Sequence, residues 1–233
     1  CGWLFGRWCD GRAEVAWIHY GRYVKERLDG KPTQYITRRQ EFYGRDFIVS
    51  PAVLIPRPET EHVIETALEK LPGAGPGAIV DVGCGSGAIA ITLALESGRP
   101  VIATDISAPA LAVAARNRDA LAAPVSLAAC DLTGALASRT AALIASNPPY
   151  VPLTDHPSLQ REVVDFEPHI ALFGGPDGMA IYNRLIADAA RVLKPGGWLV
   201  MEVAYNSDAR VRELLAADFT DIEMRTDLAG LPR

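Results

Sequence analysis

The chain has 233 residues, of which 49% are apolar and 22% charged, so it can bury the core of one large domain or of an ordinary domain with a small attachment. This composition excludes a disordered tail, a collagen-like repeat and a disulfide scaffold. The 28 acidic residues outnumber the 23 basic ones, which gives a net charge of −5. Wholesale neutralisation of a nucleic-acid backbone is therefore not expected, although a local basic patch is compatible with this balance.

Cysteine usage indicates a reducing compartment. The four cysteines show neither C-x-x-C spacing nor a nearby histidine pair, which predicts free thiols and no zinc site: Cys1, Cys9, Cys84 and Cys130. No apolar run reaches the ~18 residues needed to cross a bilayer. Arg7 and Asp10 interrupt the apolar start of the chain too early for a signal peptide. Because the chain begins with Cys rather than Met, we expect a fragment whose true start is missing.

The first 75 residues predict a helix, a hairpin and a linker. The helix covers residues 14–28 and is closed by Asp29-Gly30, and the two strands of the hairpin cover residues 34–43 and 46–49 around Gly44. Pro56 and Pro58 hold the chain extended before a helix that starts near Glu59. Residues 71–77 then lead into the next region.

From residue 78 to residue 203, strands and helices alternate. We expect strands at residues 78–82, 101–104, 125–128, 142–146 and 197–203, the last one after a Lys-Pro-Gly-Gly turn at residues 194–197, and helices at residues 89–95, 108–120 and 181–193. Alternation at this spacing predicts the α/β class, with a doubly wound, mostly parallel sheet and helices on both faces.

The first candidate site is the run Asp81-Val-Gly83-Cys-Gly85-Ser-Gly87-Ala88, which lies between a strand and a helix. Glycines there let backbone approach a ligand closely, at a helix N-terminus. The run also satisfies the dinucleotide pattern G-x-G-x-x-G/A, so it does not separate a nicotinamide binder from an S-adenosylmethionine binder. A tight turn that binds nothing is the alternative.

Asp105 follows the second strand of this region, where a carboxylate can accept both hydroxyls of a ribose. The alternative is that it caps the next helix, but Ser107 is better placed for that role. Dinucleotides and S-adenosylmethionine both carry such a ribose, so Asp105 does not discriminate between them.

The most informative motif is Ser146-Asn147-Pro148-Pro149-Tyr150, at the end of the fourth strand. The two prolines stiffen the loop. The side-chain carbonyl of Asn147 and the backbone carbonyl of Pro148 suit a planar NH₂ group, on which Tyr150 can stack. Simple turn chemistry is the alternative. No histidine lies in this loop; we interpret His62 and His169 as structural groups and expect no metal.

The motifs together resemble a known family. The Asn-Pro-Pro-Tyr loop after a glycine turn looks like the class I, Rossmann-like methyltransferases that modify planar nitrogens. A wider set of motifs is similar to the peptide chain release factor glutamine methyltransferases (the PrmC/HemK family), over about Tyr23 to Arg233: Gln34-Tyr35-Ile36, Glu41-Phe-Tyr-Gly44, Leu54-Ile-Pro-Arg-Pro-Glu-Thr-Glu61, Asp165-Phe-Glu-Pro-His169 and Phe173-Gly-Gly-Pro-Asp-Gly178.

The resemblance implies S-adenosylmethionine as cofactor and methylation of the glutamine in the Gly-Gly-Gln loop of a release factor. It implies that the cofactor is bound by Gly83, Cys84, Gly85, Ser86, Gly87, Asp105, Leu132 (against adenine) and Asn147. It implies that the substrate is bound by Asn147, Pro148, Pro149 and Tyr150, of which Asn147, Pro148 and Tyr150 act in catalysis. Arg57, Glu59 and Thr60 would lie beside the cofactor. Glu202 matches an acidic position of the family, or is a carboxylate at the edge of the core.

The family pattern also implies a division of the chain. Residues 1–33 are interpreted as a remnant of an N-terminal helical domain, residues 34–75 as hairpin and linker, and residues 76–233 as the methyltransferase domain without its final strand. The expected partner is a release factor, with no nucleic acid and no membrane, and the expected form is a cytoplasmic monomer. The alternatives are a methyltransferase acting on adenine or guanine amino groups, a nicotinamide dehydrogenase, and an inactive cofactor-binding module.

Overall fold

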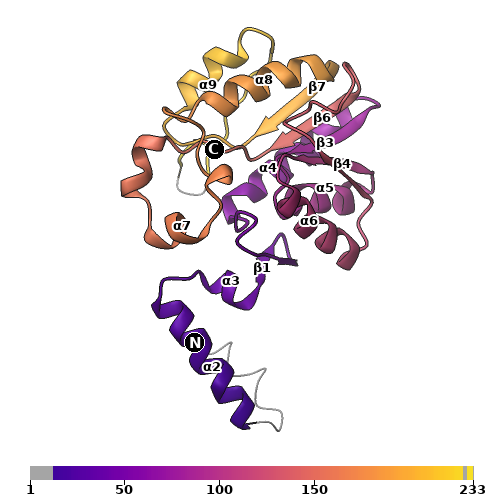
Figure 1. Ribbon diagram of the computed structural model, residues 1–233. Coiled ribbons are helices and arrows are strands. Elements are labelled where there is room, and N and C mark those ends of the chain that lie inside the picture. Colours follow the sequence, from indigo (N-terminus) through magenta and orange to yellow (C-terminus); the bar gives the residue numbers. More distant parts are fainter. Residues whose placement is uncertain (1–12, 228–229, 233) are drawn as a thin grey trace.

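The computed structural model describes residues 13–227 and 230–232, and its centre is a parallel sheet of five strands (Figure 1). The strands lie in the order β5 (Val125–Ala129), β4 (Val101–Asp105), β3 (Ala78–Val82), β6 (Ala141–Ser146) and β7 (Leu193–Met201). All four neighbouring pairs are parallel. The strand order reverses direction between β3 and β6, and in open α/β sheets ligands bind at that point, outside the carboxyl ends of the strands.

Helices cover both faces of the sheet, as the alternating pattern predicts (Figure 1). One face packs against α4 (Glu61–Lys70), α5 (Ala88–Ser97) and α6 (Ala108–Ala120), and the other against α8 (Ala180–Val192) and α9 (Asp208–Leu215). Ile79 and Val80 are neighbours in β3 but belong to the two different cores. The doubly wound α/β fold is therefore confirmed.

The N-terminal part departs from the prediction at one point. The helix α2 (Ala13–Leu28) and the hairpin strands β1 (Arg39–Phe42) and β2 (Arg45–Ile48) are present. Residues 34–37, which we assigned to the first strand, instead lie in a short helix, α3 (Thr33–Thr37). Helical geometry turns Tyr35 into an apolar cluster, where its hydroxyl donates to the Val53 carbonyl at 2.6 Å. Tertiary packing thus overrides the β-propensity of this segment.

The predicted turn at residues 194–197 lies inside β7 and not before it. Leu193 already pairs with Ala141, and the register then jumps to Trp198 opposite Leu143. The Lys-Pro-Gly-Gly residues between them form a bulge, whose Lys194 ammonium donates to the Pro76 carbonyl at 2.8 Å.

Between β6 and α8 lies a segment for which the sequence predicted no element. It contains 3₁₀ turns at Leu153–Ser158 and His169–Ala171 and the helix α7 (Arg161–Phe166). Two further 3₁₀ turns, Pro58–Thr60 and Leu71–Gly73, flank α4. No helix among the described residues is both long and apolar enough to cross a bilayer.

The apolar start of the chain, Cys1 and Cys9 lie outside the described residues. The division of the chain after residues 33 and 75 stays a prediction.

Candidate active site

The turn after β3 is built from three glycines in left-handed conformations. The φ angles of Gly83, Gly85 and Gly87 are 74°, 53° and 82°, which side chains disfavour. The backbone N–H groups of Gly83 and Cys84 donate to the Thr104 carbonyl, each at 2.9 Å, and tie the turn to β4. A Cβ atom added at Gly83 or Gly85 would meet no atom within 4 Å. The turn therefore presents bare backbone to open space at the carboxyl edge of the sheet.

Cys84 and Ser86, which separate these glycines, have buried side chains. Burial raises the pKa of the Cys84 thiol well above its ordinary value. The Ser86 carbonyl accepts a hydrogen bond from the Asn117 side chain at 2.8 Å. Because both side chains are buried, we expect only their backbones to face a ligand.

Asp105 lies beside the glycine turn. Its Oδ2 accepts from the Gly85 N–H at 2.9 Å and its Oδ1 from the Ser107 N–H at 2.8 Å. Ser107 itself caps α6, because its hydroxyl accepts from the Ala110 N–H at 3.3 Å. A carboxylate has about four acceptor sites, so Asp105 retains capacity for further donors.

Asp81, to which the sequence analysis gave no role, is the most deeply buried acid at this edge. Its Oδ2 accepts from the Ala90 N–H at 3.0 Å, and its Oδ1 has no hydrogen-bond partner among the described residues. Burial, assisted by the nearby Asp105 charge, raises the pKa of Asp81 to about 7. An acidic residue inside the otherwise apolar run of β3 is the sequence signal that could have pointed to it. Two carboxylates beside one glycine turn favour a ligand that carries positive charge.

The Asn-Pro-Pro-Tyr loop lies next to this turn because β6 is the neighbour of β3. Val82 pairs with Ser146, whose hydroxyl donates to the Val82 carbonyl at 2.7 Å. The side-chain amide of Asn147 donates to the Thr60 hydroxyl at 2.9 Å. No hydrogen bond between described residues uses Asn147 Oδ1 or the Pro148 carbonyl. Within the described part of the chain, the two predicted acceptors for an NH₂ group are therefore not used by other protein groups.

Two glycines of the segment before α8 support the back of this loop. Val151 donates to the Leu172 carbonyl and accepts from the Gly174 N–H, each at 2.9 Å. A Cβ atom at Gly174 would lie 2.7 Å from the Pro149 carbonyl oxygen, and one at Gly178 would lie 2.4 Å from that of Tyr150. Only glycine allows the two backbones to approach so closely.

Three other predicted residues lie around these loops. Leu132 follows β5, is half-buried and packs on the α8 side of the sheet. Arg57 forms an ion pair with Glu167, a buried residue whose Oε2 also accepts from the Ile55 N–H at 3.2 Å. Thr60 contacts Asn147 of the loop, and its place beside the cofactor stays a prediction.

Glu202 follows β7 and is 3% exposed. Its carboxylate accepts from the Thr60 hydroxyl at 2.6 Å and from the Tyr150 hydroxyl at 3.0 Å. It is thus more than a carboxylate at the edge of the core, because it contacts Tyr150 of the Asn-Pro-Pro-Tyr loop directly and Asn147 through Thr60.

The two histidines that we interpreted as structural have hydrogen-bonding partners. His62 Nδ1 lies 3.1 Å from Glu65 Oε2, and His169 Nε2 lies 2.9 Å from the Val164 carbonyl. Within the described part of the chain, no group of three His, Cys, Asp or Glu side chains could hold a metal ion.

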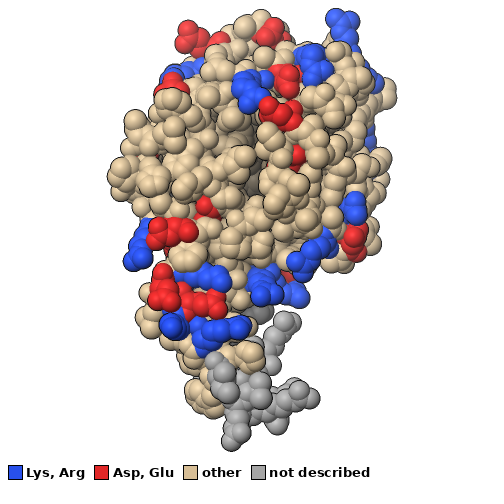
Figure 2. Space-filling model, viewed as in Figure 1, with Lys and Arg blue, Asp and Glu red and all other residues tan. Residues whose placement is uncertain are grey.

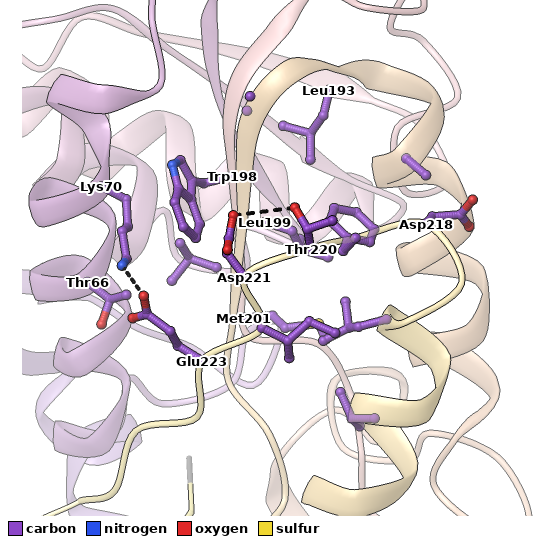
Figure 3. Close-up of a pocket in the computed structure, with 18 of the residues that line it drawn as sticks. Thr66, Lys70, Leu193, Trp198, Leu199, Met201, Asp218, Thr220, Asp221 and Glu223 are labelled. Atoms are coloured by element: carbon purple, nitrogen blue, oxygen red, sulfur yellow. Dashed lines mark hydrogen bonds and ion pairs between the residues drawn. The ribbon is translucent and has the colours of Figure 1, made fainter.

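A separate cavity of about 400 Å³ lies along β7 (Figure 3). Trp198, Leu199 and Met201 of β7 line it, and residues 218–225 pass over it (Figure 3). Lys70 of α4 forms an ion pair with Glu223 across it at 2.6 Å. None of the predicted site residues lines this cavity, so it is distinct from the candidate active site.

A doubly wound sheet of this order, with a glycine turn after β3 and Asn-Pro-Pro-Tyr after β6, defines a class I methyltransferase. Residues 63–165 match the family model of the methyltransferase small domain. A solved methyltransferase from Pyrococcus furiosus, 18% identical, superposes with a TM-score of 0.59 over 89% of this chain and 92% of that one, which shows the same fold.

Relatives define the family more narrowly. The release factor glutamine methyltransferase of Koribacter versatilis is 49% identical over 92% of this chain and 77% of that protein. The protein of the same name from Nitratidesulfovibrio vulgaris is 45% identical over 94% and 77%. The chain therefore belongs to the release factor glutamine methyltransferase family, and the alternative of a nicotinamide dehydrogenase is excluded.

The cofactor of this methyltransferase class is S-adenosylmethionine, and the residues present fit it. Its ammonium and sulfonium groups are cationic, and the edge of the sheet offers the carboxylates of Asp81 and Asp105. The Oδ1 of Asp81, which has no partner among the described residues, is an acceptor for a charged donor. The bare backbone of Gly83 and Gly85 leaves room for a ligand to lie against the turn.

Proposed function

We propose that this enzyme transfers a methyl group from S-adenosylmethionine to the side-chain amide nitrogen of a glutamine, the one in the Gly-Gly-Gln loop of a peptide chain release factor. The observation that carries the proposal is the hydrogen bonding of the Asn147 side-chain amide. Its NH₂ group is held by Thr60, and its Oδ1, like the Pro148 carbonyl, accepts no hydrogen bond from the described residues. The names of the relatives support glutamine as the group that presents two N–H donors to them.

An amide nitrogen is a poor nucleophile because its lone pair is delocalised. When bound, the cofactor supplies an electrophilic methyl group on its sulfonium. Asn147 Oδ1 and the Pro148 carbonyl accept the two N–H groups of the glutamine, aim the nitrogen along the line of displacement and stabilise the positive charge that develops on it. The nitrogen becomes more acidic as the new bond forms, so no strong base is required before attack, and its extra proton passes to solvent to leave the neutral methylated amide.

The remaining predicted residues have supporting roles in this proposal. The ring of Tyr150 forms a wall against which the flat amide stacks, and Pro149 stiffens the loop. Gly83 to Gly87 hold the cofactor through backbone groups, Asp105 accepts its ribose hydroxyls, and Leu132 packs against adenine. Asn147 lies at the junction of the two sites, since β6 and β3 are adjacent.

A nucleic-acid amino group is also planar and is the second candidate acceptor. The charge distribution favours a protein. On the face shown in Figure 2, Lys and Arg lie near the top and right edge and in a band across the lower part, with Asp and Glu among them, and the middle, where the surface is hollowed, is largely free of charge. Many basic side chains are paired, as Arg27 is with Glu162 and Arg39 with Asp46. In the row of basic groups below that middle, acidic side chains lie among the basic ones, which disfavours a phosphate backbone along it.

We infer further that the enzyme acts as a monomer in the cytoplasm, which is the compartment of its proposed partner. The described cysteines, Cys84 and Cys130, are free thiols, in agreement with reducing surroundings.

The experiment is to incubate the enzyme with labelled S-adenosylmethionine and, in parallel, with a release factor, the same release factor with the Gly-Gly-Gln glutamine replaced by Glu, RNA and DNA. We expect label only on the intact release factor, on the amide of that glutamine. Label on the Glu variant, or on nucleic acid alone, would contradict the proposal.

A further inference from the structure

Behind the Asn-Pro-Pro-Tyr loop, three polar side chains from distant parts of the chain form a continuous hydrogen-bonded line: Glu202, Thr60 and Asn147. We propose that Thr60 and Glu202 are positioning residues that fix which end of the Asn147 amide faces the substrate. This inference rests on the proposed function for its catalytic consequence, but its structural part is testable alone.

The line is buried at its inner end. Thr60 is 5% exposed and Glu202 is 3% exposed, while Asn147 is half-buried. Glu202 Oε2 lies 2.6 Å from Thr60 Oγ1, which lies 2.9 Å from Asn147 Nδ2. These partners are separated by 142 and 87 positions in the sequence, so only the folded chain brings them together.

Proton counting gives the line a direction. A carboxylate only accepts hydrogen bonds, so Thr60 must donate its single hydroxyl proton to Glu202. Thr60 Oγ1 can then only accept from Asn147, which must turn its NH₂ group toward it. The carbonyl Oδ1 of Asn147 is consequently turned away from Thr60, as binding of the substrate glutamine requires. An Asn amide with no such partner could flip and present its NH₂ group to the NH₂ group of the glutamine.

Glu202 is itself fixed in place. Tyr182, fully buried in α8, donates to the Glu202 backbone carbonyl at 3.3 Å and accepts from the Ala204 N–H at 3.1 Å. The second oxygen of Glu202 accepts from the Tyr150 hydroxyl at 3.0 Å. One carboxylate thus orients both the side-chain amide of Asn147, through Thr60, and the aromatic ring of Tyr150. A supporting shell of this kind sets how accurately a site is held.

The first test compares two substitutions of Thr60. Thr60→Ser keeps the hydroxyl, and Thr60→Val keeps the shape without it. We expect Thr60→Ser to retain kcat within about twofold and Thr60→Val to lose about 10-fold or more, with cofactor Kd unchanged by calorimetry. Thr66→Val, on α4 beside the separate cavity, is the matched control and should leave kcat unchanged.

The second test reverses the direction of hydrogen-bond donation along Glu202, Thr60 and residue 147. In Asn147→Asp, two carboxylates flank Thr60, whose one proton can serve only one of them. Adding Glu202→Gln supplies an NH₂ group to Thr60 and frees its proton for the new carboxylate at position 147. We expect the double variant to turn over faster than Asn147→Asp alone. Glu223→Gln, an exposed residue paired with Lys70, should give no such rescue. A purely structural role for Glu202 predicts a further loss.

A spectroscopic measurement separates this inference from the proposed function. The Asn147 side-chain amide resonance, identified by its loss in Asn147→Ala, should shift and exchange faster in Thr60→Val but not in Thr66→Val. If that occurs while the wild type methylates no release factor, the proposed function fails and the positioning stands. If the wild type methylates the glutamine but Thr60→Val keeps full kcat and an unchanged amide resonance, or if Glu202→Gln does not rescue Asn147→Asp, the positioning is overturned.

Discussion

The carboxylate of Asp105, at the end of β4, accepts a hydrogen bond from the backbone N–H of Gly85 in the turn after β3, at 2.9 Å. This bond fixes the glycine turn relative to the neighbouring strand, so the residue proposed to hold the ribose also holds the loop proposed to face the rest of the cofactor. We therefore expect binding of these two parts of the cofactor to be coupled through the Asp105 side chain.

Asp105→Ala should weaken cofactor binding by about 1.5–3 kcal/mol, the scale for losing hydrogen bonds to a charged group. Calorimetry with S-adenosylmethionine measures this directly. Asp131→Ala is the control, since Asp131 is an exposed acid near the same edge whose ion pair is with Arg184. Equal affinity in wild type and Asp105→Ala would mean that Asp105 only holds the glycine turn in place and does not bind the cofactor.

The local elements of this fold were largely predictable, and the contacts between them were not. The strand–glycine–helix unit at β3 and α5 follows from a short apolar run, a glycine cluster and helix formers, all adjacent in sequence. Residues 34–37 were misassigned because burial of Tyr35 depends on Val53 and other residues further along the chain.

The same limit applies to the site. Asn147 and Asp105 could be proposed from the sequence because their chemistry is visible at the ends of predicted strands. The pairing of Thr60 with Glu202 depends on register and helix placement, which no local pattern encodes. Asp81 was visible as an acid in an apolar strand, but the lack of a partner for its Oδ1 among the described residues is a property of the folded interior.

Asp81→Asn should stabilise the protein increasingly as pH rises. The pKa of Asp81 is about 7 in the folded protein against 3.8 as the reference. Between these values the unfolded chain has released the proton while the folded one still holds it, so the free energy of unfolding falls as pH rises and levels off above the folded pKa. Asparagine cannot ionise and keeps an acceptor for the Ala90 N–H.

Urea unfolding of wild type and Asp81→Asn at about pH 4, 6 and 8 measures this. The advantage of the variant should grow by as much as roughly 4 kcal/mol from the lowest to the highest pH. The exposed substitution Asp131→Asn is the control. A difference that does not vary with pH would show that Asp81 ionises in the folded state as freely as in the unfolded one.

Gly174→Ala should disturb the Asn-Pro-Pro-Tyr loop, because the new Cβ would lie 2.6 Å from the Gly178 carbonyl oxygen and 2.7 Å from that of Pro149. Overpacking of this kind costs about 1–3 kcal/mol. We expect a lower Tm and a lower kcat. Gly73→Ala adds the same methyl group where no atom lies within 4 Å and should change neither. A Gly174→Ala variant as stable and active as Gly73→Ala would refute the close approach of the two backbones.

The central claim is that Asn147 orients the glutamine amide for methyl transfer, and the single-turnover rate of Asn147→Ala on a release factor tests it most directly. With cofactor affinity measured in parallel, the rate should fall by about 10²-fold or more while the cofactor Kd stays nearly constant. A rate equal to that of the wild type would contradict the claim.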